Sequence, residues 1–152
     1  SYVSDELAEN IDAWPPWFGG ASAEVIGRMC QQCTQTTFIA HGPGVWAAIS
    51  GDADEARKLY PDGPVTPGGS LPRLLREHEN LYCDISATSG HNALARDKDH
   101  AVRFLTEFQD RLLFGRDGFD RRHLDLLETL DLPQEVLKKV LFANANRLVP
   151  VE

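Results

Sequence analysis

Two side chains that can hold metals and carry protons stand at the ends of short apolar runs. His41 closes the run Thr37-Phe-Ile-Ala and is followed by Gly42-Pro43. Asp117 comes two residues after Gly115, which ends the apolar triplet 112–114. Such runs are typical of buried strands, and α/β folds place their chemistry where parallel strands end. An imidazole and a carboxylate are both zinc ligands and both move protons near neutral pH. We therefore expect one site built from both segments.

Each candidate has a structural alternative. Asp117 is otherwise a capping or salt-bridged carboxylate beside Arg116, and His41 a strand-end histidine satisfied by the backbone. Arg116 suits a substrate carboxylate through its two-pronged fork, or it pairs with Asp117 or Asp120. Trp46 either walls a pocket or belongs to the core.

Polar residues follow a further apolar run, 80–86, and should share the same rim. Ser86, Thr88, Ser89 and His91 are candidates for contacts with the polar groups of a substrate. The alternative is an ordinary polar surface loop over residues 88–96.

Cysteines and the remaining histidines favour structural interpretations. Cys30 and Cys33 have the spacing of redox and zinc motifs, but they fall late in a helical pattern, where no helix N-terminus lowers a thiol pKa. We expect two cysteines on a helix face, one or both buried, and Cys83 in the core. The remaining histidines stand among charged neighbours on helical segments and are expected at the surface: His78, His100 and His123.

Hydrophobic spacing and capping residues predict alternating helices and strands. After an irregular segment 1–20, we expect the following elements in chain order: a helix capped by Ser22 to about Cys33, a strand 37–40, a helix near 44–49, a helical stretch 52–60, a loop 61–69, a helix capped by Ser70, a strand 80–86, a loop 88–96, a helix begun by Asp97 or Asp99, a strand 112–114, a helix capped by Asp120, and a last helix with Pro133 in its first turn.

This order predicts an α/β fold with a parallel sheet and right-handed crossovers. Three strands leave two edges with unpaired backbone groups. Further strands or a partner chain should therefore cover them, and we expect a homo-oligomer or a complex.

Composition limits the function classes. The chain has 152 residues, enough for one domain with its own core, and a net charge of -8. That charge argues against nucleic-acid and anionic membrane surfaces. No apolar run approaches the roughly 18 residues of a membrane span, and no signal peptide is visible. Three cysteines, an odd number, favour a reducing, cytoplasmic setting.

Four segments together resemble a known family. In order they are Phe38-Ile-Ala-His41-Gly-Pro, Asn80-Leu-Tyr-Cys-Asp-Ile-Ser86, Asp110-Arg-Leu-Leu-Phe-Gly-Arg-Asp117 and Asn144-Ala-Asn-Arg-Leu148. They are similar to the last third to half of the amidohydrolase-2 family, metal-dependent hydrolases and decarboxylases on a TIM barrel, aminocarboxymuconate-semialdehyde decarboxylase among them. The resemblance implies a partial (β/α)8 barrel in which 37–41, 81–86 and 112–116 match strands six, seven and eight.

The resemblance also implies roles for the two strand-end residues. Asp117 matches a ligand of a divalent ion, most plausibly zinc, and a proton carrier. His41 matches a histidine beside the metal, acting as acid or base or, in binuclear relatives, as a ligand. The implied reaction is hydrolysis by a metal-activated water, or decarboxylation, of a small carboxylate, aromatic ones included.

Three departures set this chain apart from the family pattern. It has no His-x-His pair, it opens after the family's fifth strand with its histidine ligand, and Arg116 stands where Thr or Ser is usual. We therefore expect the C-terminal part of such an enzyme. The alternatives are a non-catalytic partial barrel that self-associates, one half of a split enzyme, or a zinc or redox protein using Cys30 and Cys33.

Overall fold

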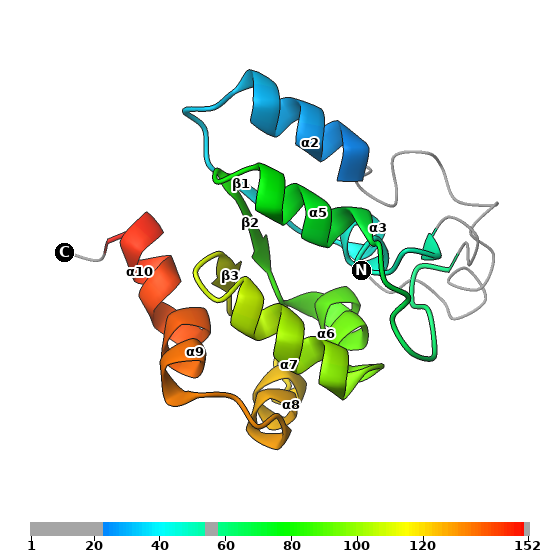
Figure 1. Ribbon diagram of the computed structural model, residues 1–152. Helices are drawn as coiled ribbons and strands as arrows, with labels where there is room; N and C mark the ends of the chain where they lie inside the picture. Colours follow the sequence, from blue (N-terminus) through cyan, green and yellow to red (C-terminus); the bar gives the residue numbers. More distant parts are fainter. Residues whose placement is uncertain (1–22, 54–57, 151–152) are drawn as a thin grey trace.

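The computed structural model describes residues 23–53 and 58–150 and shows three parallel strands alternating with helices (Figure 1). The strands lie in the order β1-β2-β3, which confirms the predicted parallel α/β arrangement. The element bounds are α2 Ala23–Gln32, β1 Phe38–Ala40, α3 Pro43–Ala47, α5 Ser70–Glu77, β2 Leu81–Asp84, α6 Ala87–Ala95, α7 Lys98–Glu107, β3 Leu112–Leu113, α8 Arg122–Thr129, α9 Gln134–Lys138, a π-helical turn η2 Lys139–Ala143, and α10 Asn144–Leu148.

One face of the sheet is covered by helices. Leu81, Cys83 and Leu112 are each 0% exposed, and α5 packs against β2. In Figure 1, α2, α5 and α7 lie side by side; α2 contacts α5, and an ion pair links α5 to α7. Side chains alternate between the faces of a strand, so every second residue of each strand joins this core.

The other face is more open. The alternation that buries Leu81 and Cys83 turns Tyr82 and Asp84 to the opposite side, where both are only partly buried. Ile39 pairs with Tyr82 in the register and is 49% exposed. In a closed barrel this face is the interior, which side chains from other strands fill. The exposed Ile39 side chain is therefore available to pack against further strands.

The two edges of the sheet differ, which corrects the expectation that both are unpaired. At β3, the N–H of Phe114 donates to the Val140 carbonyl (2.9 Å), and the Asn144 amide donates to the Leu112 carbonyl (2.8 Å). The C-terminal helices therefore cover that edge. At β1, the Phe38 N–H donates toward β2, to Asn80 (2.8 Å), so the backbone groups of the next residue, Ile39, face outward.

Several predicted boundaries were wrong. Residues 88–96, expected as a loop, lie largely in helix α6, because this polar stretch also supplies the buried residues Ala93 and Leu94. Gly90 is needed there, since a Cβ would lie 2.4 Å from the Ile85 carbonyl oxygen. The single last helix is three consecutive pieces, with Pro133 at the N-cap of α9 rather than inside its first turn.

The predicted caps had mixed outcomes. Asp97 caps α7 by accepting from the His100 N–H (2.9 Å), as expected. Ser70 is the first residue of α5, with Gly69 at its N-cap. Asp120 lies one residue before the N-cap of α8, although it accepts from the backbone N–H of Arg122 at 3.1 Å. The segment 1–20, the Ser22 cap and part of the stretch 52–60 lie outside the described residues.

Cys30 and Cys83 are buried, as predicted, whereas Cys33 lies just beyond the helix on which it was expected. Cys30 is 1% exposed on α2, Cys83 is 0% exposed in β2, and Cys33 is exposed just after α2. Burial raises the pKa of the Cys30 and Cys83 thiols. Thiolates are the reactive and metal-binding form, so neither buried cysteine is suited to redox or zinc chemistry.

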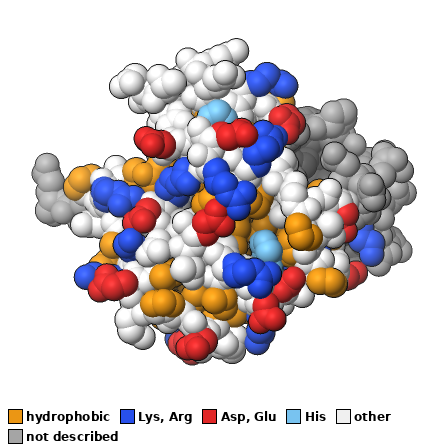
Figure 2. Space-filling model, viewed as in Figure 1, with side chains coloured by type: hydrophobic (Ala, Val, Ile, Leu, Met, Phe, Trp, Pro, Cys, Tyr) orange, Lys and Arg blue, Asp and Glu red, His pale blue; other side chains and the backbone are white. Residues whose placement is uncertain are grey.

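Figure 2 shows basic and acidic side chains interspersed on the face covered by helices. Pairs such as Arg76 with Glu107 (2.6 Å) belong to this surface. Within the described residues, no helix is long and apolar enough to cross a bilayer.

Candidate functional site

The centre of the site is a contact between the ends of β1 and β2. The register pairs Ala40 with Cys83, so His41 stands level with Asp84 on the open face of the sheet. His41 Nδ1 lies 3.1 Å from both carboxylate oxygens of Asp84. The two side chains are 47% and 23% exposed, so the pair is reachable from solvent. A carboxylate only accepts, so the imidazole proton sits on Nδ1 and a neutral ring leaves Nε2 free to accept a proton.

Sequence reasoning did not single out Asp84. In the sequence it lies inside the predicted strand 80–86, because the apolar Ile85 follows it. The strand ends at Asp84, and this observed boundary places the carboxylate at the end of the strand.

Ser86 completes this group. Its backbone N–H donates to Asp84 Oδ1 at 3.1 Å, its hydroxyl contacts the same oxygen, and its Oγ lies 3.3 Å from His41 Nδ1. Ser86 is 6% exposed. The structure therefore places this predicted substrate contact where it holds the Asp84 carboxylate.

Trp46 lies in the core. It is 1% exposed, packs edge-on against Phe104 with ring centroids 6.0 Å apart, and donates from Nε1 to the Asp84 carbonyl at 3.1 Å. Of the two interpretations left open, the core one fits this burial. The hydrogen bond from Trp46 fixes the backbone of Asp84 from the core side.

Asp117 lies on the loop that follows β3. Its φ of 55° is in the left-handed region, which costs a non-glycine residue about 1–2 kcal/mol. Its carboxylate is exposed and makes no hydrogen bond or ion pair with any residue of the described ranges. Because β2 lies between β1 and β3, Asp117 and His41 follow the two strands that flank Asp84, at one end of the sheet.

Arg116 is tied to the site through its backbone. Its carbonyl accepts from the Ala87 N–H at 3.3 Å. Its guanidinium is exposed and forms no ion pair within 23–53 and 58–150, so neither expected partner, Asp117 or Asp120, holds it. Asp120 pairs instead with Arg122 at 2.7 Å.

His91 lies on α6, partly buried against a second histidine. Its ring meets that of His123 edge-on, with centroids 5.5 Å apart. Burial, then the neighbouring His123 and Arg122, lower the pKa of His91. His123 itself is 2% exposed, so its prediction as a surface residue was wrong. Its Nε2 donates to the Ala87 carbonyl at 2.9 Å.

The donors at this end of the sheet fit a divalent ion in kind but not in number. Imidazole nitrogen and carboxylate oxygen are typical zinc ligands. However, the described residues contain no group of three or more His, Cys, Asp or Glu side chains placed to hold an ion. Catalytic zinc normally takes about three protein ligands, so the described residues do not by themselves complete such a set.

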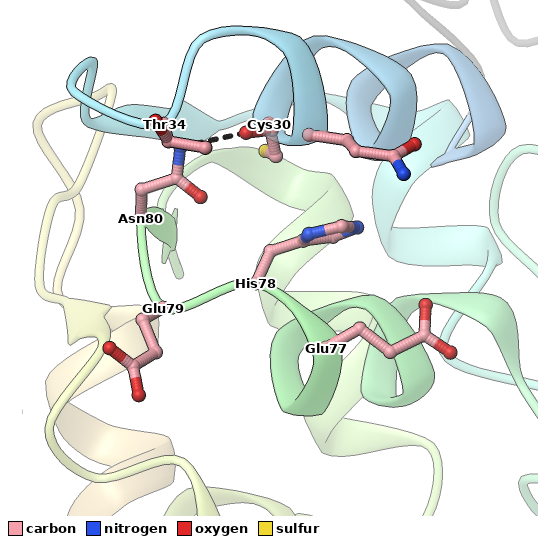
Figure 3. Close-up of a pocket in the computed structure, with 7 residues that line it drawn as sticks. Cys30, Thr34, Glu77, His78, Glu79 and Asn80 are labelled. Carbon is pink, nitrogen blue, oxygen red and sulfur yellow. Dashed lines mark hydrogen bonds between the residues drawn. The ribbon is translucent and has the colours of Figure 1, made fainter.

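A pocket of about 600 Å³ lies elsewhere, at the opposite end of the strands (Figure 3). Asn80, just before β2, crosses to α2 and donates to the Cys30 carbonyl at 3.2 Å. The lining residues are Cys30, Gln31, Thr34, Glu77, His78, Glu79 and Asn80. None of the candidate site residues is among them.

Comparison with known families defines the class of the protein. The Amidohydrolase family model matches residues 39–151, which is well over half of the chain. The chain therefore belongs to the amidohydrolase family, as the sequence motifs indicated. No curated protein and no solved structure matches the chain.

Proposed function

We propose that the chain is the C-terminal part of a metal-dependent hydrolase or decarboxylase that acts on a small carboxylate, aromatic ones included. One observation carries this proposal: the solvent-accessible His41 imidazole is fixed by Asp84 at the carboxyl end of parallel strands. An oriented histidine with a free Nε2 is what general acid–base catalysis requires. Membership of the amidohydrolase family supports the same chemistry.

In this proposal, each side chain has a separate task. Asp84 holds the Nδ1 proton, so His41 takes or gives a proton at Nε2. The Asp117 carboxylate takes the proton lost by the attacking water. Both residues follow strands at the same end of the sheet, and they would contribute to holding a divalent ion, zinc by preference. Such an ion supplies Lewis-acid activation of water and of a substrate oxygen.

We assign the substrate carboxylate to Arg116. Its exposed guanidinium has no ion-pair partner within the described residues and follows the same strand as Asp117. A guanidinium binds a carboxylate through two parallel hydrogen bonds, which fixes the orientation of the substrate as well as its position.

The remaining ligands must come from further strands, and β1 offers the place for them. The outward backbone groups of Ile39 can pair with another strand, whereas the C-terminal helices cover the β3 edge. We therefore propose that a second chain or another part of the protein adds strands at β1. Light scattering should find a dimer or larger species for the isolated chain, and a stable monomer would contradict this.

Metal content tests the proposal. The protein is purified without a histidine tag and analysed by elemental mass spectrometry, together with Asp117→Ala and Asp131→Ala. Asp131 is an exposed carboxylate on a different loop and serves as the matched control. Where added strands complete the site, we expect about one equivalent of metal in the wild type and the control, and its loss in Asp117→Ala.

Two results would count against the proposal. Equal metal in all three proteins would mean that Asp117 is not a ligand. No metal in any of them would favour the alternative of a non-catalytic partial barrel.

A further inference from the structure

The turn between β2 and α6 is held in an unusual backbone conformation. Ala87 has a φ of 59°, in the left-handed region that L-residues rarely adopt. It directly follows Ser86, which binds the Asp84 carboxylate. Nothing in the alanine side chain favours this conformation, so contacts from elsewhere in the fold must maintain it.

Two hydrogen bonds maintain the turn from opposite directions. The Ala87 N–H donates to the Arg116 carbonyl at 3.3 Å, which joins the turn to the loop of Asp117. The Ala87 carbonyl accepts from His123 Nε2, on α8, at 2.9 Å. Ala87 thus links three segments: the end of β2, the loop after β3, and α8.

The His123 ring is buried, and its bond to the Ala87 carbonyl is the one hydrogen bond that it makes within the described residues. Its side chain is among the few buried polar ones, at 2% exposure. A carbonyl oxygen only accepts, so the contact requires the proton on Nε2. Nδ1 is then left as a buried acceptor, and it has no partner in the described part of the chain. Burying an unsatisfied nitrogen is unfavourable, so a leucine would serve better if His123 had only to fill space.

We propose that His123 is a positioning residue of the site: it fixes the Ala87 carbonyl and thereby sets both Ser86 with Asp84 and the loop of Asp117. That this positioning serves catalysis rests on the proposed function. The hydrogen bonds around Ala87 do not themselves involve a metal or a substrate. His123 touches neither His41 nor Asp117, so it acts through the turn.

The start of α6 leaves the turn little freedom to relax. The Gly90 N–H donates to the Ser86 carbonyl at 3.3 Å, and α6 approaches the backbone of Ile85, just after β2, so closely that only glycine fits at this position. If the hydrogen bond to the Ala87 carbonyl is lost, the backbone of the turn itself must therefore move, next to Ser86 and Arg116. Those are the neighbours whose positions matter for the site.

The test compares two substitutions of His123. His123→Gln keeps a terminal N–H that can reach the Ala87 carbonyl, whereas His123→Met has similar length and no donor. His100→Met is the control, because His100 also has a buried, unpartnered Nδ1 but lies on α7. Amide exchange at Ala87 and the ring nitrogen signals of His41 are recorded by NMR at one neutral pH. Urea unfolding gives the global stability.

We expect His123→Met to speed exchange at Ala87 by about tenfold or more beyond its effect on global stability, as the loss of one hydrogen bond of ordinary strength predicts. The His41 ring signals should shift in the same variant. His123→Gln should stay within about threefold of the wild type at Ala87, and His100→Met should leave both signals unchanged.

Three results would overturn the proposal. One is unchanged Ala87 exchange and His41 signals in His123→Met. The second is a His123→Gln variant no better than His123→Met. The third applies even if the methionine variant fails to fold: wild-type nitrogen shifts that place the His123 proton on Nδ1. A wild type without metal that still shows the expected signals would refute the proposed function and leave this positional role intact.

Discussion

Asn144 provides the sharpest test of how the C-terminal helices hold β3. Its side chain is 0% exposed, and its amide donates to the carbonyls of Gln109 (2.7 Å) and Leu112 (2.8 Å). Its Oδ1 is buried and has no partner in the described ranges. Asn144→Ala therefore leaves two carbonyls without a donor and removes one unsatisfied oxygen.

The expected loss follows from these contacts. Each of the two carbonyls left unpaired costs about 1–3 kcal/mol, whereas removing the unsatisfied oxygen and the better helix propensity of alanine together offset about 1 kcal/mol. We expect a net destabilisation of about 1–5 kcal/mol, a shift of about 0.5–2.5 M in the urea midpoint at an m value of about 2 kcal/mol/M. Urea unfolding followed by far-UV circular dichroism measures it. Asn146→Ala is the matched control, because Asn146 is exposed on the same helix.

Asn144→Asp separates hydrogen bonding from side-chain volume. Aspartate is nearly isosteric with asparagine but, when ionised, has no N–H and faces two carbonyl oxygens. Burial beside these acceptors raises its folded pKa, so the variant should recover stability relative to wild type as the pH falls toward about 5.

If Asn144→Ala and Asn146→Ala differ by less than about 0.5 kcal/mol, α10 does not hold β3 in the way inferred.

Three further predictions concern the site, the thiols and a cap. In the completed enzyme, Asp84→Asn should lower kcat by about 10²-fold or more, because His41 loses the group that orients it for proton transfer; unchanged steady-state kinetics would contradict this role. Ellman's reagent should modify Cys33 in the native protein, and the two buried cysteines, whose thiol pKa is raised by burial, only after unfolding. Hydrogen bonds from the backbone N–H groups of His100 and Val65 lower the pKa of Asp97, so the cap stabilises the fold above the ordinary carboxyl pKa. Asp97→Ala should cost about 1–2 kcal/mol at neutral pH, and thermal melts should show this difference from wild type shrink as the pH falls below about 4.

The strand-end rule predicted from sequence where His41 and Asp117 lie, while their roles stay predictions. His41 and Asp117 stand at the ends of their runs, and the structure brings both to one end of a parallel sheet. The partner of His41 was missed because Asp84 lies inside the predicted strand 80–86. The strand ends at Asp84, two residues earlier, and this boundary decides which side chain is released.

His123 was misjudged because its immediate neighbours are charged. The helical period, however, places it three, four and seven residues before Leu126, Leu127 and Leu130, on the buried stripe of α8. Periodicity was the better guide than local charge. What no pattern predicts is the bond from this ring to the Ala87 carbonyl, because that contact depends on how α8 meets the turn after β2.

The register of the sheet is what turns separate strand ends into a site. Pairing Ala40 with Cys83 sets His41 level with Asp84 on one face, and a slip of one residue would turn the histidine toward the helices. The pairing of Asp84 with Leu113 sets Gly115 beside Ser86, where a Cβ would lie 3.0 Å from the serine Cβ. A Cβ there would be unusually tight against Ser86, so glycine lets the chain after β3 pass this residue closely. The position of His41 beside Asp84 thus depends on the backbone pairing of the strands, and the group around Asp84 depends also on the helices that keep β3 in place.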